Sequence, residues 1–177
     1  GFTGSGEVGK LMLIYAGQSN MKRVTNECGG KSPQVILADC EDLDTAAATA
    51  VSAIYGNQGE VCSAGSRLLV ERPIYDAFIE KFTEVAKTAH QPGDPLDPAT
   101  TMGPLVTPEQ QDRVLRYIDI GQKEGANLAF GGAVPAGLNA GCYVEPTLFT
   151  NVANSMRIAQ EEIFGPVASV IPVDNVD

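Results

Sequence analysis

Apolar side chains recur with helical spacing in four stretches of the chain. Positions three and four residues apart are apolar in residues 5–18, 42–56, 73–90 and 108–124, which predicts four amphipathic helices. Ser5 is placed to cap the first helix, and acidic residues stand at the start of the second, where the helix dipole favours them. Pro73 stands near the first position of the third helix, which suits a residue without a backbone N–H.

Shorter apolar runs between these stretches predict strands. They fall at residues 22–27, 34–38, 66–72 and 126–132, and residues 161–173 indicate a turn that leads into a further strand. Residues 91–110 contain five prolines and are expected to form a loop. Because strands alternate with helices, the pattern predicts an α/β domain with a largely parallel sheet.

Composition and charge narrow the classes of function. The chain has 177 residues, of which 44% are apolar, enough for one well-buried domain. Its net charge of −10 would repel a phosphate backbone and an anionic membrane surface alike, so we expect no nucleic-acid or membrane partner. No apolar run approaches the roughly eighteen residues of a membrane span, which predicts a soluble protein.

Cysteine and histidine usage limits the metal and redox chemistry. The four cysteines are far apart with no C-x-x-C pair, a pattern that suits a reducing compartment such as the cytoplasm. His90 is the only histidine, so a histidine-rich metal site is excluded and no metal is expected. It follows a long amphipathic segment and precedes a Pro/Gly turn, and we expect a solvated helix end there.

The opening stretch FTGSGEVGKL matches two nucleotide-binding loops. Residues 4–10 spell G-x-x-x-x-G-K, but Lys10 is followed by Leu11, where a triphosphate-binding loop needs a hydroxyl to ligate magnesium. Residues 4–9 also spell G-x-G-x-x-G, and a helix and a strand are predicted to follow. Glu27 comes 18 residues after Gly9, where an acid could hold a ribose, so the dinucleotide interpretation is the better one.

A second chemical feature is Cys62, in the stretch GNQGEVCSAGSR. We expect a loop entering a short helix here, and a cysteine at a helix N-terminus gains thiolate character and can attack a carbonyl. Since the chain has a single histidine, the base that works with Cys62 is expected to be a carboxylate. Glu27 is the candidate.

Four stretches together resemble a known family. FTGSGEVG, ECGGKSP, NQGEVCSAGSR and EEIFGPV are similar to four signature motifs of the NAD(P)-dependent aldehyde dehydrogenase superfamily, in the same order. The resemblance implies a three-layer αβα sandwich with a largely parallel sheet. It implies that residues 1–27 are a remnant of the NAD(P)-binding domain and residues 28–177 a catalytic domain truncated at its C-terminus. Within the superfamily, it suggests the branch of betaine aldehyde and γ-glutamylaminobutyraldehyde dehydrogenases.

The resemblance also implies catalytic roles. Cys62 would add to the aldehyde to give a thiohemiacetal, which passes hydride to the nicotinamide of NAD or NADP. Glu27 would then activate the water that hydrolyses the thioester. Two alternatives stay open: a scaffold that keeps the fold without the reaction, and transfer of the acyl group to coenzyme A, against which Glu27 argues.

Cofactor-binding roles come from the same resemblance. Gly4 and Ser5 would lie against the pyrophosphate at a helix N-terminus, together with Gly6, where the family commonly has threonine. Glu162 would hold the nicotinamide ribose, and Phe164 would pack beside the nicotinamide. A helix-end acid and a core aromatic are the structural alternatives for these last two residues.

The extent of the resemblance sets further expectations. Compared with the family, the chain begins within the cofactor domain and stops soon after FGPV, so we expect part of a longer enzyme that turns over aldehyde poorly or not at all by itself. The parent enzyme is expected to be a homo-oligomer acting on a small aldehyde. The apolar helix from Gly6 is expected to favour association. The sequence does not distinguish which aldehyde is the substrate, nor NAD from NADP.

Overall fold

The computed structural model describes residues 1–175 and divides the chain into two compact units, residues 1–30 and residues from 31 onward. The division falls after the glycine pair that follows Cys28, whereas the sequence placed a domain boundary after Glu27. Each unit has its own internal contacts.

The first unit is a strand–helix–strand segment. Strand β1 (Phe2–Gly4) leads into helix α1 (Gly6–Gln18), and strand β2 (Asn26–Cys28) returns parallel to β1. The predicted helix is confirmed, and the Ser5 side chain caps it by accepting a hydrogen bond from the Val8 N–H at 3.3 Å. The strand expected at 22–27 is wrong in extent: β1 is three residues long, so it offers ladder partners only to residues 26–28.

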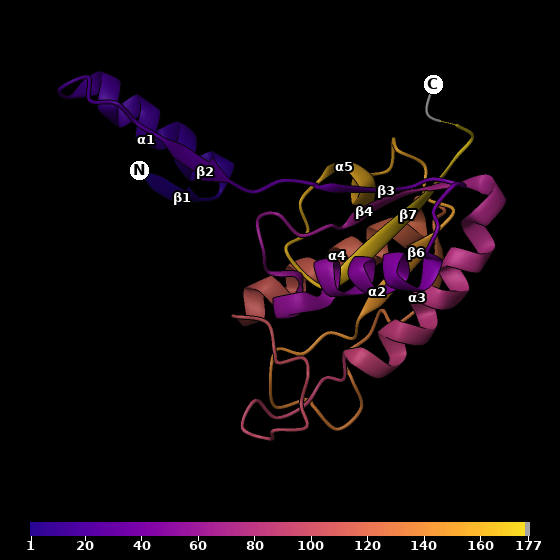
Figure 1. Ribbon diagram of the computed structural model, residues 1–177. Helices are drawn as coiled ribbons and strands as arrows, with labels where there is room; N and C mark the ends of the chain where they lie inside the picture. Colours follow the sequence, from indigo (N-terminus) through magenta and orange to yellow (C-terminus); the bar gives the residue numbers. More distant parts are fainter. Residues whose placement is uncertain (176–177) are drawn as a thin grey trace. The chain divides into compact units, whose positions relative to one another are not determined.

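The second unit is built on a five-stranded sheet (Figure 1). Its strands lie in the order β3 (Pro33–Ile36), β4 (Arg67–Glu71), β7 (Val167–Val173), β6 (Thr147–Thr150) and β5 (Asn127–Phe130). The first three pairings are parallel, and only β5 runs antiparallel to its neighbour β6. The expectation of a largely parallel sheet is therefore confirmed.

Helices cover both faces of this sheet (Figure 1). Helices α2 (Leu43–Tyr55) and α3 (Tyr75–Ala89) pack on one face, and α4 (Pro108–Lys123) and the short α5 (Arg157–Gln160) pack on the other. Alternation along the strands separates the two cores, because Leu68 and Val70 face α2 and α3 while Leu69 faces α4 and α5. The three-layer αβα arrangement is confirmed.

Aromatic side chains from α3 dominate the first core. Phe78 and Phe82 are fully buried, and the ring of Phe82 meets that of Tyr55 edge-on with centroids 5.8 Å apart. Each such buried side chain contributes about 1.5–3 kcal/mol of transfer free energy. The apolar side chains whose spacing predicted this helix are thus the ones that pack it against the sheet.

The parallel strands place three connecting segments at one edge of the sheet. Strands β3, β4 and β7 are neighbours running in the same direction, so the segments that enter them meet at their common amino-terminal edge. These segments include residues 31–32, 60–66 and 161–166. The fold therefore gathers the stretches around Cys62 and Phe164, which are about a hundred residues apart in sequence.

Candidate functional site

Cys62 lies in a turn between the 3₁₀ helix η1 (Gly56–Gly59) and strand β4, and its side chain is exposed. The expectation of a short helix after this cysteine is wrong. The Gly65 N–H donates to the Ala53 carbonyl at 3.1 Å, and the ladder with β3 begins at Arg67, which leaves no room for a helical turn. The helix that was expected to favour the thiolate is therefore not formed at this turn.

The backbone before Cys62 has an unusual shape. Asn57, Gln58 and Gly59 all adopt left-handed conformations, with φ of 48°, 58° and 71°. Gly59 also lies against the backbone of Gly165: a Cβ at this position would stand 2.3 Å from the Gly165 carbonyl oxygen. This close approach, open only to glycine, packs the cysteine turn directly on the segment that carries Phe164.

A side-chain hydrogen bond also attaches the cysteine turn on its other side. The Glu60 carboxylate accepts a hydrogen bond from the Val106 N–H at 3.3 Å, and burial raises the pKa of this carboxyl. Glu60 therefore attaches the turn to the proline-rich loop that precedes α4. The sequence analysis did not identify Glu60, because the local sequence does not show that its partner is Val106, which is far along the chain.

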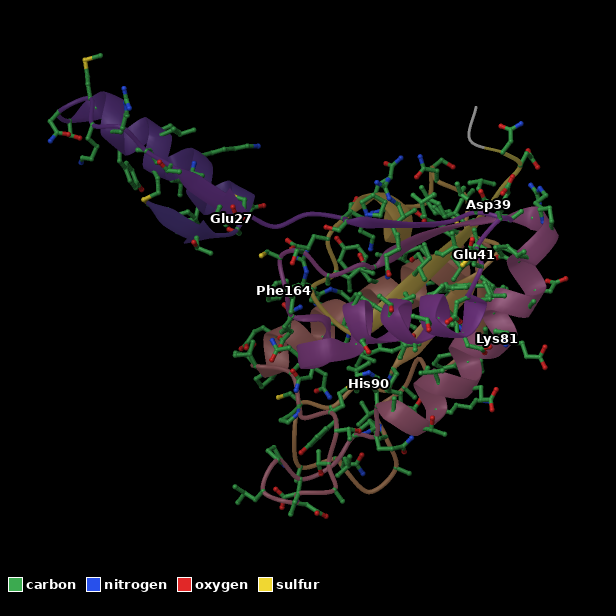
Figure 2. The ribbon with its side chains drawn as sticks, in the orientation of Figure 1. Glu27, Asp39, Glu41, Lys81, His90 and Phe164 are labelled. Atoms are coloured by element: carbon green, nitrogen blue, oxygen red, sulfur yellow. The ribbon has the colours of Figure 1, made fainter. Side chains whose placement is uncertain are left out.

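Helix α4 holds the backbone of Phe164, the residue labelled in Figure 2, through a hydrogen bond from Gln110. Its φ of 60° is uncommon for a bulky residue, and its ring is half-buried, not part of the core. Gln110 donates to the carbonyls of Phe164 at 2.5 Å and Ile163 at 3.1 Å, and Arg113 donates to the Glu162 carbonyl at 2.6 Å. The structure thus adds two residues that the sequence did not indicate.

Glu162 and its neighbour Glu161 have different surroundings. Glu161 accepts from Tyr117 at 2.6 Å and pairs with Arg157 at 3.0 Å, and these hydrogen bonds lower the pKa of its carboxyl to about 2. Glu162 is half-buried, and its Oε1 is buried without a hydrogen-bond partner in the part of the chain that the structure describes. Glu161 is thus engaged within the protein, whereas Glu162 has one oxygen that is left unpaired.

The first unit carries the other predicted site residues. Gly4 ends β1, Ser5 caps α1 and Gly6 is the first residue of the helix. A Cβ at Gly6 would meet nothing within 4 Å, so the space beside the first turn is open. Glu27 is exposed in the middle of β2, opposite Thr3 (Figure 2). Glu27 and Cys62 belong to different units, and their pairing stays a prediction.

The surroundings of His90 correct one expectation. It ends α3 as predicted, but it is half-buried instead of solvated, with its ring edge-on to that of Tyr55 at 5.9 Å between centroids. Burial lowers the pKa of this imidazole.

Within residues 1–175, no three His, Cys, Asp or Glu side chains are grouped so as to hold a metal ion. None of the helices in this range is long and apolar enough to cross a membrane.

The fold and site define a class of protein: a three-layer α/β domain with an exposed cysteine turn packed beside a strained aromatic segment at one sheet edge. The family model for the aldehyde dehydrogenase family matches residues 1–177. The chain belongs to the aldehyde dehydrogenase family.

Known relatives support this assignment and differ in length from the chain. Human aldehyde dehydrogenase 1A1 is 50% identical over 176 residues, which are 99% of this chain and 34% of that protein. The indole-3-acetaldehyde dehydrogenase AldA of P. syringae, solved as a C302A mutant with NAD+ and IAA, is 55% identical with a TM-score of 0.95, covering 98% of this chain and 35% of that one. The γ-glutamyl-γ-aminobutyraldehyde dehydrogenase of Burkholderia cenocepacia is 55% identical with a TM-score of 0.94, covering 99% and 35%. The chain spans about a third of the length of these relatives.

Proposed function

We propose that this chain carries the catalytic cysteine of an enzyme that oxidises a small aldehyde to a carboxylic acid with NAD or NADP. The observation that carries the proposal is the exposed thiol of Cys62, on a turn fixed against the Phe164 segment. Aldehyde dehydrogenases are the relatives that share half or more of its residues. Residues 1–27 would be a remnant of the cofactor-binding domain and residues 28–177 the truncated catalytic domain, a boundary close to the division of the chain into compact units after Gly30.

The residues present fit a dinucleotide. The N-terminus of α1, where Gly4 and Ser5 precede the first turn and Gly6 leaves open space, offers backbone N–H groups to a pyrophosphate. Glu162 offers the buried and unpartnered Oε1 to a ribose hydroxyl, and the half-buried ring of Phe164 would pack beside the nicotinamide. Structures of relatives in complex with NAD+ support this choice of cofactor. When bound, the nicotinamide accepts the hydride released from the substrate carbon.

Two residues would carry the covalent chemistry. The Cys62 sulfur attacks the aldehyde carbon, the C–S bond forms, and the carbonyl oxygen takes up a proton to give a thiohemiacetal. Loss of hydride and a proton leaves a thioester on Cys62. Glu27 then accepts a proton from water, the hydroxide adds to the thioester carbon, and the C–S bond breaks to release the acid and return the thiolate. Each of the two side chains is exposed.

The cellular setting is part of the same proposal. We propose that the parent enzyme acts in the cytoplasm, which the dispersed free cysteines and a rat relative named as cytosolic support. That it is a homo-oligomer is proposed from the resemblance to the family alone. Neither nucleic acid nor a membrane is proposed as a partner, since the net charge is −10.

A pair of substitutions tests the reaction in the full-length protein that carries this chain. Cys62→Ala should abolish aldehyde-dependent NAD reduction. Glu27→Gln should retain a burst of about one NADH per site and slow the steady state by about a hundredfold or more, because the thioester forms but hydrolyses slowly. The 177-residue chain alone is the third arm and should turn over aldehyde poorly or not at all.

Other outcomes separate the alternatives. Full steady-state turnover by Glu27→Gln would rule out its role as the base. Product formation that requires coenzyme A would indicate acyl transfer in place of hydrolysis. Wild-type protein without aldehyde oxidation, and without preferential thiol labelling at Cys62, would favour a scaffold that has kept the fold.

A further inference from the structure

The cysteine turn contains two residues in a backbone conformation that few side chains adopt. Asn57 and Gln58 have φ of 48° and 58°, in the left-handed region that favours glycine. Such residues cost free energy and persist only where surrounding contacts hold them. Side-chain contacts between the cysteine turn and the rest of the domain therefore decide where the backbone before Cys62 lies.

Two side chains of the turn bind the same loop. The Glu60 carboxylate accepts a hydrogen bond from the Val106 N–H at 3.3 Å. The Gln58 amide oxygen accepts from the Gly103 N–H at 3.0 Å, in the orientation that also gives the amide nitrogen a partner. Both residues flank the glycine of the turn that packs on the Phe164 segment. The turn is thus attached to the loop immediately before and after this glycine.

The loop itself is anchored independently of the turn. Met102 and Leu105 are buried, and the Leu105 N–H donates to the Cys142 carbonyl at 2.9 Å. Thr107 follows directly and caps helix α4 by accepting from the Gln110 N–H at 3.2 Å. Val106 therefore offers its N–H from a segment whose neighbours on both sides are fixed.

Helix α4 connects this loop to the Phe164 segment. Gln110, in the first turn of the helix, donates to the Phe164 carbonyl at 2.5 Å. The Phe164 segment then returns to the cysteine turn through the close approach of Gly165 and Gly59. The hydrogen bond of Glu60 closes this series of contacts, which runs from the turn to the loop, to α4, to the Phe164 segment and back to the turn.

We propose that Glu60 is a positioning residue that fixes the cysteine turn to the loop, so that the Cys62 sulfur keeps one place beside the Phe164 segment. The inference rests on the proposed role of Cys62 as the nucleophile. Glu60 acts through the backbone, two residues before the thiol, and takes no part in bond formation. A small displacement of a reacting atom lowers the rate by a large factor, so a turn released from the loop should attack the aldehyde slowly.

Three substitutions separate the hydrogen bond from the charge of Glu60. Glu60→Gln keeps an oxygen that can accept from Val106, and Glu60→Asp keeps the charge on a side chain one methylene too short. Glu60→Ala removes both. Glu71→Ala is the matched control, because the Glu71 Oε2 accepts from the Ala38 N–H at 2.6 Å, a bond of the same kind after the other end of β4.

Hydrogen exchange in this chain tests the attachment without any activity. Amides in residues 58–64 should exchange about tenfold faster in Glu60→Ala and Glu60→Asp than in the wild type, because the turn opens locally. Glu60→Gln and Glu71→Ala should leave these amides unchanged. Wild-type exchange of residues 58–64 in the Ala and Asp variants overturns the proposal. If Glu60→Ala does not fold, the comparison of Asp with Gln decides.

A single-turnover measurement in the full-length protein tests the consequence for the reaction. The rate of the NADH burst should fall by about tenfold or more in Glu60→Ala and Glu60→Asp. It should stay within about threefold of the wild type in Glu60→Gln, which restores the hydrogen bond, and in Glu71→Ala. An equally slow burst in Glu71→Ala would indicate a general loss of stability and overturn the positioning role, as would a slow burst in Glu60→Gln.

The two hypotheses fail differently. If Cys62→Ala retains aldehyde-dependent NAD reduction, the proposed function of Cys62 is wrong. If Cys62→Ala abolishes this activity while Glu60→Ala and Glu60→Asp keep the wild-type burst, only the positioning role of Glu60 is overturned.

Discussion

At the scale of single residues, Gly59 determines how the cysteine turn packs against the segment that carries Phe164. It combines a φ of 71° with a position where a Cβ would stand 2.3 Å from the Gly165 carbonyl oxygen. Gly59→Ala should therefore destabilise the protein by about 1–3 kcal/mol and lower Tm in a calorimetric scan. Gly56→Ala is the matched control, because a Cβ there meets nothing within 4 Å, and its Tm should stay within a few degrees of wild type. Equal stability of both variants would show that this contact does not constrain the turn.

Single residues also show where sequence reasoning was sufficient and where it was not. The Ser5 cap could be predicted because a cap and its partner are three residues apart. The environment of Cys62 could not, because it depends on a hydrogen bond from Gly65 to Ala53 and on ladder partners in a distant strand. Glu162 and Glu161 look alike in sequence, and only the positions of Tyr117 and Arg157 distinguish them.

At the scale of elements, helix α4 supports the Phe164 segment. Gln110 near its start donates to the carbonyls of Ile163 and Phe164. Gln110→Ala should cost about 1–3 kcal/mol, because the partly buried Phe164 carbonyl loses its donor, the Ile163 carbonyl keeps only its bond from Arg113, and a left-handed phenylalanine loses its support. Gln122→Ala on the same helix is exposed and should change stability by less than about 0.5 kcal/mol.

Hydrogen exchange locates the effect of the Gln110 substitution. Amides in residues 162–168 should exchange faster in Gln110→Ala than in Gln122→Ala, since local opening follows the loss of local contacts. Uniform acceleration over the whole second unit would instead indicate a global loss of stability. That result would contradict a specific role of α4 in holding this segment.

The helices and strands differ in whether nearby or distant residues of the chain determine their positions. The helices over residues 43–55, 75–89 and 108–123 could be predicted because amphipathic periodicity is a local property that matches the buried face. The strand at 26–28 was misplaced, because its length is set by the three-residue partner β1. The strand order β3-β4-β7-β6-β5 is not local at all, and it is what brings Cys62 and Phe164 to one edge.

At the scale of the whole molecule, exposed apolar side chains on α1 favour association between chains, whereas the net negative charge of the chain opposes it. Leu11 is 42% exposed and Ile14 is 49% exposed, three residues apart on the helix, while the net charge is −10. We expect this chain to self-associate at high protein concentration, and more strongly at high salt, because salt screens the repulsion and leaves apolar burial unaffected. Sedimentation velocity at several concentrations and two ionic strengths measures this.

One double variant and one single variant make the association test specific. Replacing both Leu11 and Ile14 by Lys should shift the chain toward monomer, since lysine keeps helix propensity but removes the apolar surface. Leu96→Lys is the matched control, because Leu96 is 91% exposed but stands alone in a loop, and it should leave association unchanged. The double substitution also brings the net charge closer to zero, which by itself would favour association. A shift to monomer would therefore have to come from the lost apolar contacts, and unchanged association would show that α1 is not the contact surface.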